Sequence, residues 1–151
     1  MRAFVLQDWL TVRGAGTVTT IVQNEANYLS LDAYQDVVFW LQVAEYTSSA
    51  NSLIVNYETA PLKDETLFAV MTSATLSTPI MTPPLITKVL ASAASTPLAR
   101  WVRWHVTSTN GSAWDMTFRI LVAGNQLFSV GQGMGVGGLG AGMGGWPMRS
   151  G

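Results

Sequence analysis

Hydrophobic and polar residues alternate with a period of two along much of the chain. The segment Trp101–Val106 places Trp101, Arg103 and His105 on one side and three apolar residues on the other. Every second residue of Trp114–Ala123 is likewise apolar, while Asp115, Thr117 and Arg119 fall between them. Because successive side chains of a β-strand point to opposite faces, both segments are predicted to be half-buried strands.

Further segments share this alternation, or a richness in β-branched and aromatic residues, with turn residues between them. The nine predicted strands are Ala3–Val12, Thr17–Gln23, Tyr28–Leu31, Val37–Tyr46, Ser52–Thr59, Phe68–Leu76, Leu85–Ala91, Trp101–Ser108 and Trp114–Ala123. No long helical period accompanies them. The pattern predicts an all-β fold, a two-sheet antiparallel β-sandwich of jelly-roll type.

The segments between these strands carry turn and loop signals. Asn110-Gly111 lies between two alternating segments and predicts a hairpin that pairs the last two long strands. Ala60–Glu65 holds a proline and three charges, so we expect an exposed loop with Asp64 and Glu65 in solvent. Thr78–Pro84 contains three prolines and cannot lie inside a central strand.

The composition changes abruptly after Asn125, which divides the chain into a sandwich domain (1–125) and a C-terminal arm (126–151). More than half of residues 131–145 are glycine, and the arm also carries Leu139, Met143 and Trp146. Flexible linkers use polar spacers instead of such apolar residues. We therefore expect an arm that docks on a neighbouring subunit, with these three residues as contacts and Trp146 as the main anchor. The competing interpretation is an unstructured terminus.

The composition indicates a surface with unusually little charge. The 151 residues are 48% hydrophobic and 11% charged, with a net charge of −1, whereas a typical soluble domain is about 25% charged. Either a Ser/Thr-rich surface faces solvent, or neighbouring subunits cover much of it. There is no basic segment for nucleic acid and no long apolar stretch for a membrane, so neither partner is expected. The first residues do not resemble a signal peptide, so we expect synthesis in the cytoplasm.

The residues that carry most enzyme chemistry are sparse. Cysteine is absent and His105 is the single histidine, so neither a metal site, a cofactor site nor a nucleophilic triad is predicted. Asp115 and Arg119 share a strand face, and we expect them to form cross-strand ion pairs with Arg100 or Arg103. We expect a protein that is not an enzyme, and a hydrolase that uses scattered carboxylates is the least favoured alternative.

Six tryptophans are many for this length, and most are expected to fill the core. An exposed pair would suit either a subunit interface or a platform on which sugar rings stack. Trp101 and Arg103 are therefore candidate interaction residues. The main alternative function is a carbohydrate-binding module, which requires Trp101 and its neighbours on the same face to be exposed.

Two resemblances support these expectations. The segments Pro97–Val106 and Phe118–Gly124 resemble the closing strands of galactose-binding-like jelly rolls, which implies the fold. The whole chain, including Leu31–Val43 and Tyr57–Pro61, is similar in style to small β-sandwich virion proteins of tailed phages, of the decoration or capsid-associated type. That resemblance implies a structural virion component, assembled in the host cytoplasm, that binds copies of itself and a major capsid or other virion protein.

Overall fold

The computed structural model describes residues 1–50, 52–77, 85–90 and 96–126, with the backbone alone described for 85–90. These residues form nine strands and two single turns of 3-10 helix. The strands are β1 (Arg2–Gly14), β2 (Thr20–Val22), β3 (Leu29–Ser30), β4 (Tyr34–Ser48), β5 (Leu53–Ala60), β6 (Ala69–Leu76), β7 (Leu85–Leu90), β8 (Trp101–Ser108) and β9 (Trp114–Gln126). The two helical turns are η1 (Glu25–Asn27) and η2 (Glu65–Leu67).

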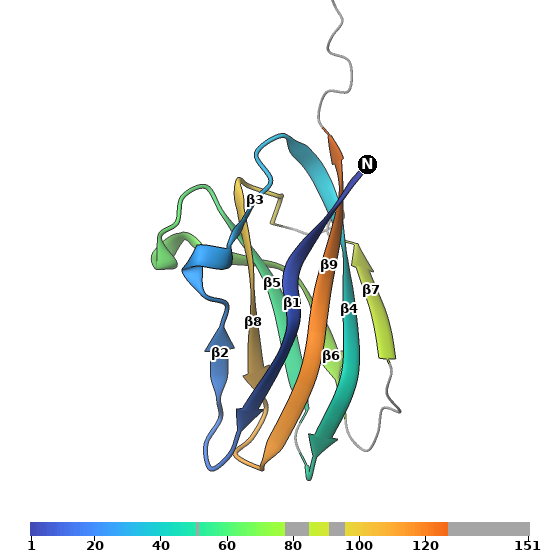
Figure 1. The fold of residues 1–151 in the computed structure, drawn as a ribbon. Coiled ribbons are helices and arrows are strands. Elements are labelled where there is room, and N and C mark those ends of the chain that lie inside the picture. The colour runs from blue at the N-terminus through green and yellow to red at the C-terminus, as the bar shows by residue number, and fades with distance from the viewer. Residues whose placement is uncertain (51, 78–84, 91–95, 127–151) are drawn as a thin grey trace, which may run out of the picture.

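The strands form two sheets that face each other (Figure 1). One, here called the β1 sheet, has the order β1-β9-β4-β7, and the other, the β8 sheet, has the order β2-β8-β5-β6, with β3 also pairing with β8. All pairings among the described strands are antiparallel. When β2 and β3 are counted as one interrupted strand, this is the order of an eight-stranded jelly roll, which confirms the predicted fold class.

The core lies between the two sheets because the alternating apolar side chains of both point inward. Phe39 of β4 stacks on Tyr57 of β5 with ring centroids 4.1 Å apart. Trp104 of β8 meets Phe118 of β9 edge to face at 5.1 Å. Each aromatic pair joins one sheet to the other, so the largest buried rings hold the sandwich together.

All nine predicted strands are present. The prediction for β8 has the correct bounds, whereas β2 is limited to Thr20–Val22 and the long strands β4 and β9 extend further than predicted. The inward-facing residues of β8 and β9 are buried as the alternation predicted. The described sandwich ends at Gln126, and the arm residues Leu139, Met143 and Trp146 lie outside the described residues.

The predicted hairpin at Asn110-Gly111 is wrong. β8 and β9 lie in different sheets, so this turn crosses from one sheet to the other. Its polar groups tie together neighbouring turns at one end of the sandwich: Asn110 Nδ2 donates to Ala50 O at 2.9 Å, and Gly16 N donates to Gly111 O at 2.7 Å. Local turn chemistry is the same in a hairpin and in such an arch, and packing of both strands into one core selects the arch.

Candidate functional site

Arg103, a candidate interaction residue from the sequence, lies on the outer face of the β8 sheet but is covered by the chain itself. Its Nε donates to Glu58 Oε2 at 2.7 Å, and its Nη1 donates to Glu65 Oε1 at 2.6 Å and to the Tyr28 hydroxyl at 2.8 Å. Phe68 packs beneath the guanidinium, 3.9 Å from ring centroid to Cζ. Arg103 is therefore 5% exposed and pins the segments around η1 and η2 to the sheet.

The electrostatics of this cluster favour its charged form. Burial opposes ionisation of Glu58, but hydrogen bonds from His105 and Arg103, together with their charges, hold its pKa below the usual value. The hydrogen bond from Arg103 lowers the pKa of Glu65 in the same way. Glu65 is exposed, as the sequence predicted, with its side chain 70% exposed, and it also forms the outer ion pair of the cluster.

His105 extends this network along β8. Its Nδ1 lies 3.1 Å from Glu58 Oε2, and its Nε2 lies 3.0 Å from Asn56 Nδ2. The cross-strand pairs that the sequence predicted are wrong, because β9 pairs with β1 and β4, and β8 is in the other sheet. Arg103 consequently meets Glu58, and Arg119 meets Gln42.

Trp101 lies at the end of β8 with cations over its ring. Lys63 Nζ is 4.4 Å and Arg100 Cζ is 5.4 Å from its ring centroid. Trp101 is half-buried, and its neighbours on the same face, Arg103 and His105, are buried and half-buried. A row of exposed rings for stacking sugars is therefore absent from this face over the described length of β8.

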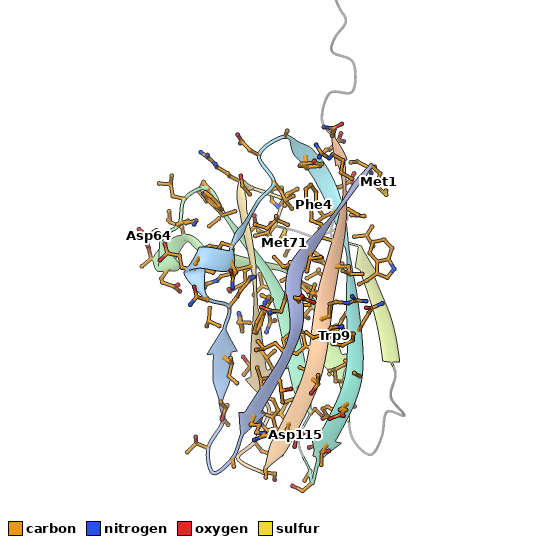
Figure 2. All side chains as sticks on the ribbon, in the orientation of Figure 1. Met1, Phe4, Trp9, Asp64, Met71 and Asp115 are labelled. Atoms are coloured by element: carbon orange, nitrogen blue, oxygen red, sulfur yellow. The ribbon has the colours of Figure 1, made fainter. Side chains whose placement is uncertain are left out.

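The outer face of the β1 sheet carries a surface that the alternation alone did not single out. Trp9 of β1 is 48% exposed, and Arg119 of β9 lies against its ring with Cζ 4.9 Å from the centroid. Arg119 Nε in turn donates to Gln42 Oε1 of β4 at 2.8 Å. The three side chains form a row across three neighbouring strands, and Figure 2 shows Trp9 on the side of the sheet that faces the viewer.

A second, apolar row lies beside the first. Val5 is opposite Leu121, and Leu121 is opposite Trp40, so β1, β9 and β4 each contribute one side chain. Val5 is 56% exposed, and Leu121 and Trp40 are half-buried. These three residues and two neighbours on the same face, Trp9 and Val38, form the outer patch. Its members are Val5, Trp9, Val38, Trp40 and Leu121.

The position of Trp9 follows from irregularities in β1. The register with β9 shifts between Val5 and Gln7 and again between Gln7 and Leu10. Such bulges redirect side chains: Gln7 Oε1 accepts from Trp104 Nε1 at 3.2 Å, while Trp9 lies against Arg119 outside the sandwich. Because period-two alternation cannot locate bulges, no direct signal in the sequence pointed to this row.

A shallow hollow of about 460 Å³ lies at the far end of the sandwich, where β1 ends and β9 begins. Arg13, Gly14, Thr47 and Trp114 contribute to its lining, and Asp115 supplies its one carboxylate. Nowhere in the described ranges do three or more histidine or carboxylate side chains gather to hold a metal ion. No helix of the described residues is long and apolar enough to span a membrane.

Comparisons with known proteins add little. No protein-family model and no curated protein sequence matches the chain. Solved structures that align with it include that of the infectious bursal disease virus Gx strain, with 8% identity and a TM-score of 0.44 over 84% of this chain and 32% of that chain. Another is Eiger TNF from S. frugiperda, with 11% identity and a TM-score of 0.39 over 84% and 98% of the two chains. The chain thus spans about a third of the viral protein. Neither alignment bears on function.

Proposed function

We propose that this protein is a non-enzymatic structural component of a virus or phage particle, of the decoration or capsid-associated type. It assembles with copies of itself and with a major capsid or other virion protein. The observation that carries the proposal is the contrast between the two outer faces. The chain's own segments cover the central polar cluster of the β8 sheet, whereas the edge strand β1 and the central strands β9 and β4 of the other sheet together present the outer patch.

The chemistry of the outer patch suits a protein partner. Interfaces are enriched in aromatic residues and arginine and depleted in other charges at their centre. Trp9 is an aromatic anchor whose ring already rests on Arg119, so little side-chain freedom remains to be lost on binding. The low charge of the whole chain supports the same conclusion, because a surface that stays in solvent normally carries more charge.

Repeated contacts make such a surface effective. One interface of about 800 Å² per partner gives an affinity that depends strongly on its anchors. In a lattice the same contact recurs, and an arm that adds a second attachment raises the effective concentration of the first. The arm (126–151) supports this mechanism through its composition, with glycine for close backbone approach and Leu139, Met143 and Trp146 as apolar contacts.

Light scattering of the full chain over a range of concentrations, with electron microscopy of the same samples, tests the proposal. We expect association into closed oligomers or extended lattices. Deletion of residues 131–151 should weaken association at least tenfold and leave the melting temperature of the sandwich unchanged. A chain that stays monomeric at every concentration, alone and with candidate capsid protein, contradicts the proposal. Retention on a carbohydrate resin would instead favour a sugar-binding module.

A further inference from the structure

The apolar side chains of the two outer faces are arranged differently. On the β8 sheet, Arg103, His105, Asn56 and Glu58 occupy the middle of the central strands, the half-buried Trp101 and Ile54 lie near the ends of these strands, and the exposed Val22 lies on the edge strand β2. On the β1 sheet the central strands β9 and β4 themselves present Leu121, Trp40 and Val38. No described segment lies in front of this face in Figure 1. An apolar centre on the outer face of a sheet is the form of a docking surface.

The row formed by Trp9, Arg119 and Gln42 bounds the apolar centre on one side. Arg119 follows Leu121 at two residues' distance on the same face of β9, about 7 Å along the strand. Its guanidinium already contacts both the Trp9 ring and Gln42, so it does not require an anionic ligand. The surface therefore suits an uncharged, apolar segment that lies flat across the strands.

The chain itself contains such a segment. Residues 131–148 include no charged side chain, and glycine alternates there with apolar residues such as Met143 and Trp146, while the single charge of the segment, Arg149, follows these anchors. Glycine allows a backbone to approach a pleated surface closely. The described chain also ends beside this sheet, because β9 is an inner strand of the β1 sheet and Gln126, its last residue, is opposite Tyr34.

The direction in which β9 ends, together with the length of the arm, favours the sheet of another copy over the arm's own sheet. Leu121 lies five residues before Gln126, about 17 Å back along β9, whereas Trp146 follows Gln126 by up to about 65 Å of extended chain. From Leu121, opposite Trp40, the strand continues to Gln126, opposite Tyr34, at the end where the described chain leaves the sandwich; Figure 1 shows this course of β9. An arm that returned to its own patch would have to reverse direction after Gln126, whereas an arm that continues outward leads to a neighbouring copy.

We propose that the outer patch is the docking site for residues 131–151 of a second copy of this chain. The inference rests on the proposed function, since it identifies the surface and the segment through which the chain would assemble. Trp9 and the apolar row Val5, Leu121 and Trp40 receive the arm, and Trp146 and Met143 are its anchors.

The absence of cysteine from the sequence allows a direct test by disulfide cross-linking of full-length chains. A Val5→Cys chain and a Gly144→Cys chain carrying a mass tag are mixed and oxidised. We expect a covalent heterodimer of the two chains. The matched control replaces Val5→Cys by Val22→Cys, an exposed valine on the opposite outer face, and should give at least tenfold less heterodimer.

A chain with both Val5→Cys and Gly144→Cys distinguishes the alternative arrangement. If this chain cyclises as a monomer, and the mixture of the two single-cysteine chains gives no heterodimer, the arm folds back on its own sheet. That result overturns the inference. Association of the wild-type chain by light scattering, with no cross-link in either format, would also overturn it but leave the proposed function standing. A wild-type chain that remains monomeric even with capsid protein would remove the proposed function itself.

A second variant tests the patch without cysteine. Trp9→Thr keeps a strand-forming residue at an exposed position, so the fold should be retained. We expect the concentration for half-association to rise at least tenfold, whereas Val22→Thr leaves it unchanged. An equal effect of the two substitutions contradicts a specific role for the outer patch.

Discussion

Arg103 shows that a side chain on the outer face of a strand can nevertheless be buried. Its position on β8 directs it away from the core, yet Tyr28, Glu65 and Phe68 from two distant segments close over it. Loss of this guanidinium would leave the buried Glu58 carboxylate without its closest cation, which is costly in a desolvated position. The cluster is therefore a stabilising feature, and Trp9 and Arg119 on the other sheet are better candidates for contact with a partner.

The ion pairs of Arg103 predict a specific dependence of stability on pH. Because folding lowers the pKa values of Glu58 and Glu65, their contribution is complete above the unfolded value of about 4.3 and is lost as the pH falls through the folded values. The Arg103→Met variant should be about 3 kcal/mol less stable than wild type at pH 7. That difference should narrow below about pH 4.

Urea unfolding at several pH values measures both quantities. Arg13→Met, which removes an exposed arginine from β1, is the matched control and should change the free energy of unfolding by less than about 0.5 kcal/mol. A difference between wild type and Arg103→Met that is independent of pH would contradict the role given to the two carboxylates.

At the scale of elements, the end of β1 and the start of β9 are packed without space for another carbon. Gly14 is opposite Trp114 in the register of the two strands. A Cβ at Gly14 would lie 2.5 Å from Trp114 Nε1 and 2.8 Å from Thr19 Oγ1. The indole is buried, so it cannot turn away into solvent. Glycine is therefore required here by close approach of a side chain.

We expect Gly14→Ala to lower the free energy of unfolding by about 1–3 kcal/mol, because the buried indole or the strand end must shift. Thermal unfolding followed by circular dichroism measures the effect. Ala15→Ser, at the exposed neighbouring position, is the control and should be neutral within about 0.5 kcal/mol. If the two variants melted at the same temperature, the close approach would have no energetic consequence.

At the scale of the whole molecule, the jelly roll pairs segments from opposite ends of the described chain. Arg2 is opposite Gly124, and β9 lies between β1 and β4. Among the described strands, β5 and β6 form a pair that is also adjacent in sequence, whereas most other pairs join distant segments. Long loops must therefore close before most of the sheet contacts form, which slows folding.

Folding of this chain should accordingly take milliseconds to seconds, as for other sandwiches with distant strand pairs. Stopped-flow dilution from urea, followed by tryptophan fluorescence, measures the rate. A chain that lacks residues 131–151 should fold at the same rate, since the sandwich is unchanged. Folding in microseconds would show that local contacts dominate the barrier.

Alternation and turn residues by themselves determined the nine strands, the inward faces of β8 and β9, and the class of the fold. They did so because strand side chains alternate with a fixed period and burial requires apolar residues on one face. His105, Arg103 and Trp101 were also placed correctly on one face of β8. Charge and composition favour an assembling protein, and this interpretation stays a prediction.

Only the tertiary structure decided which strands are neighbours and what covers each face. Asn110-Gly111 has the chemistry of a hairpin turn, but packing of Trp104 against Phe118 across the core makes it an arch between sheets. Glu65 meets Arg103, and Arg119 meets Trp9, across separations that no local pattern encodes. Neighbours distant in sequence are selected by the packing of the whole core, whereas period and turn chemistry act only over a few residues.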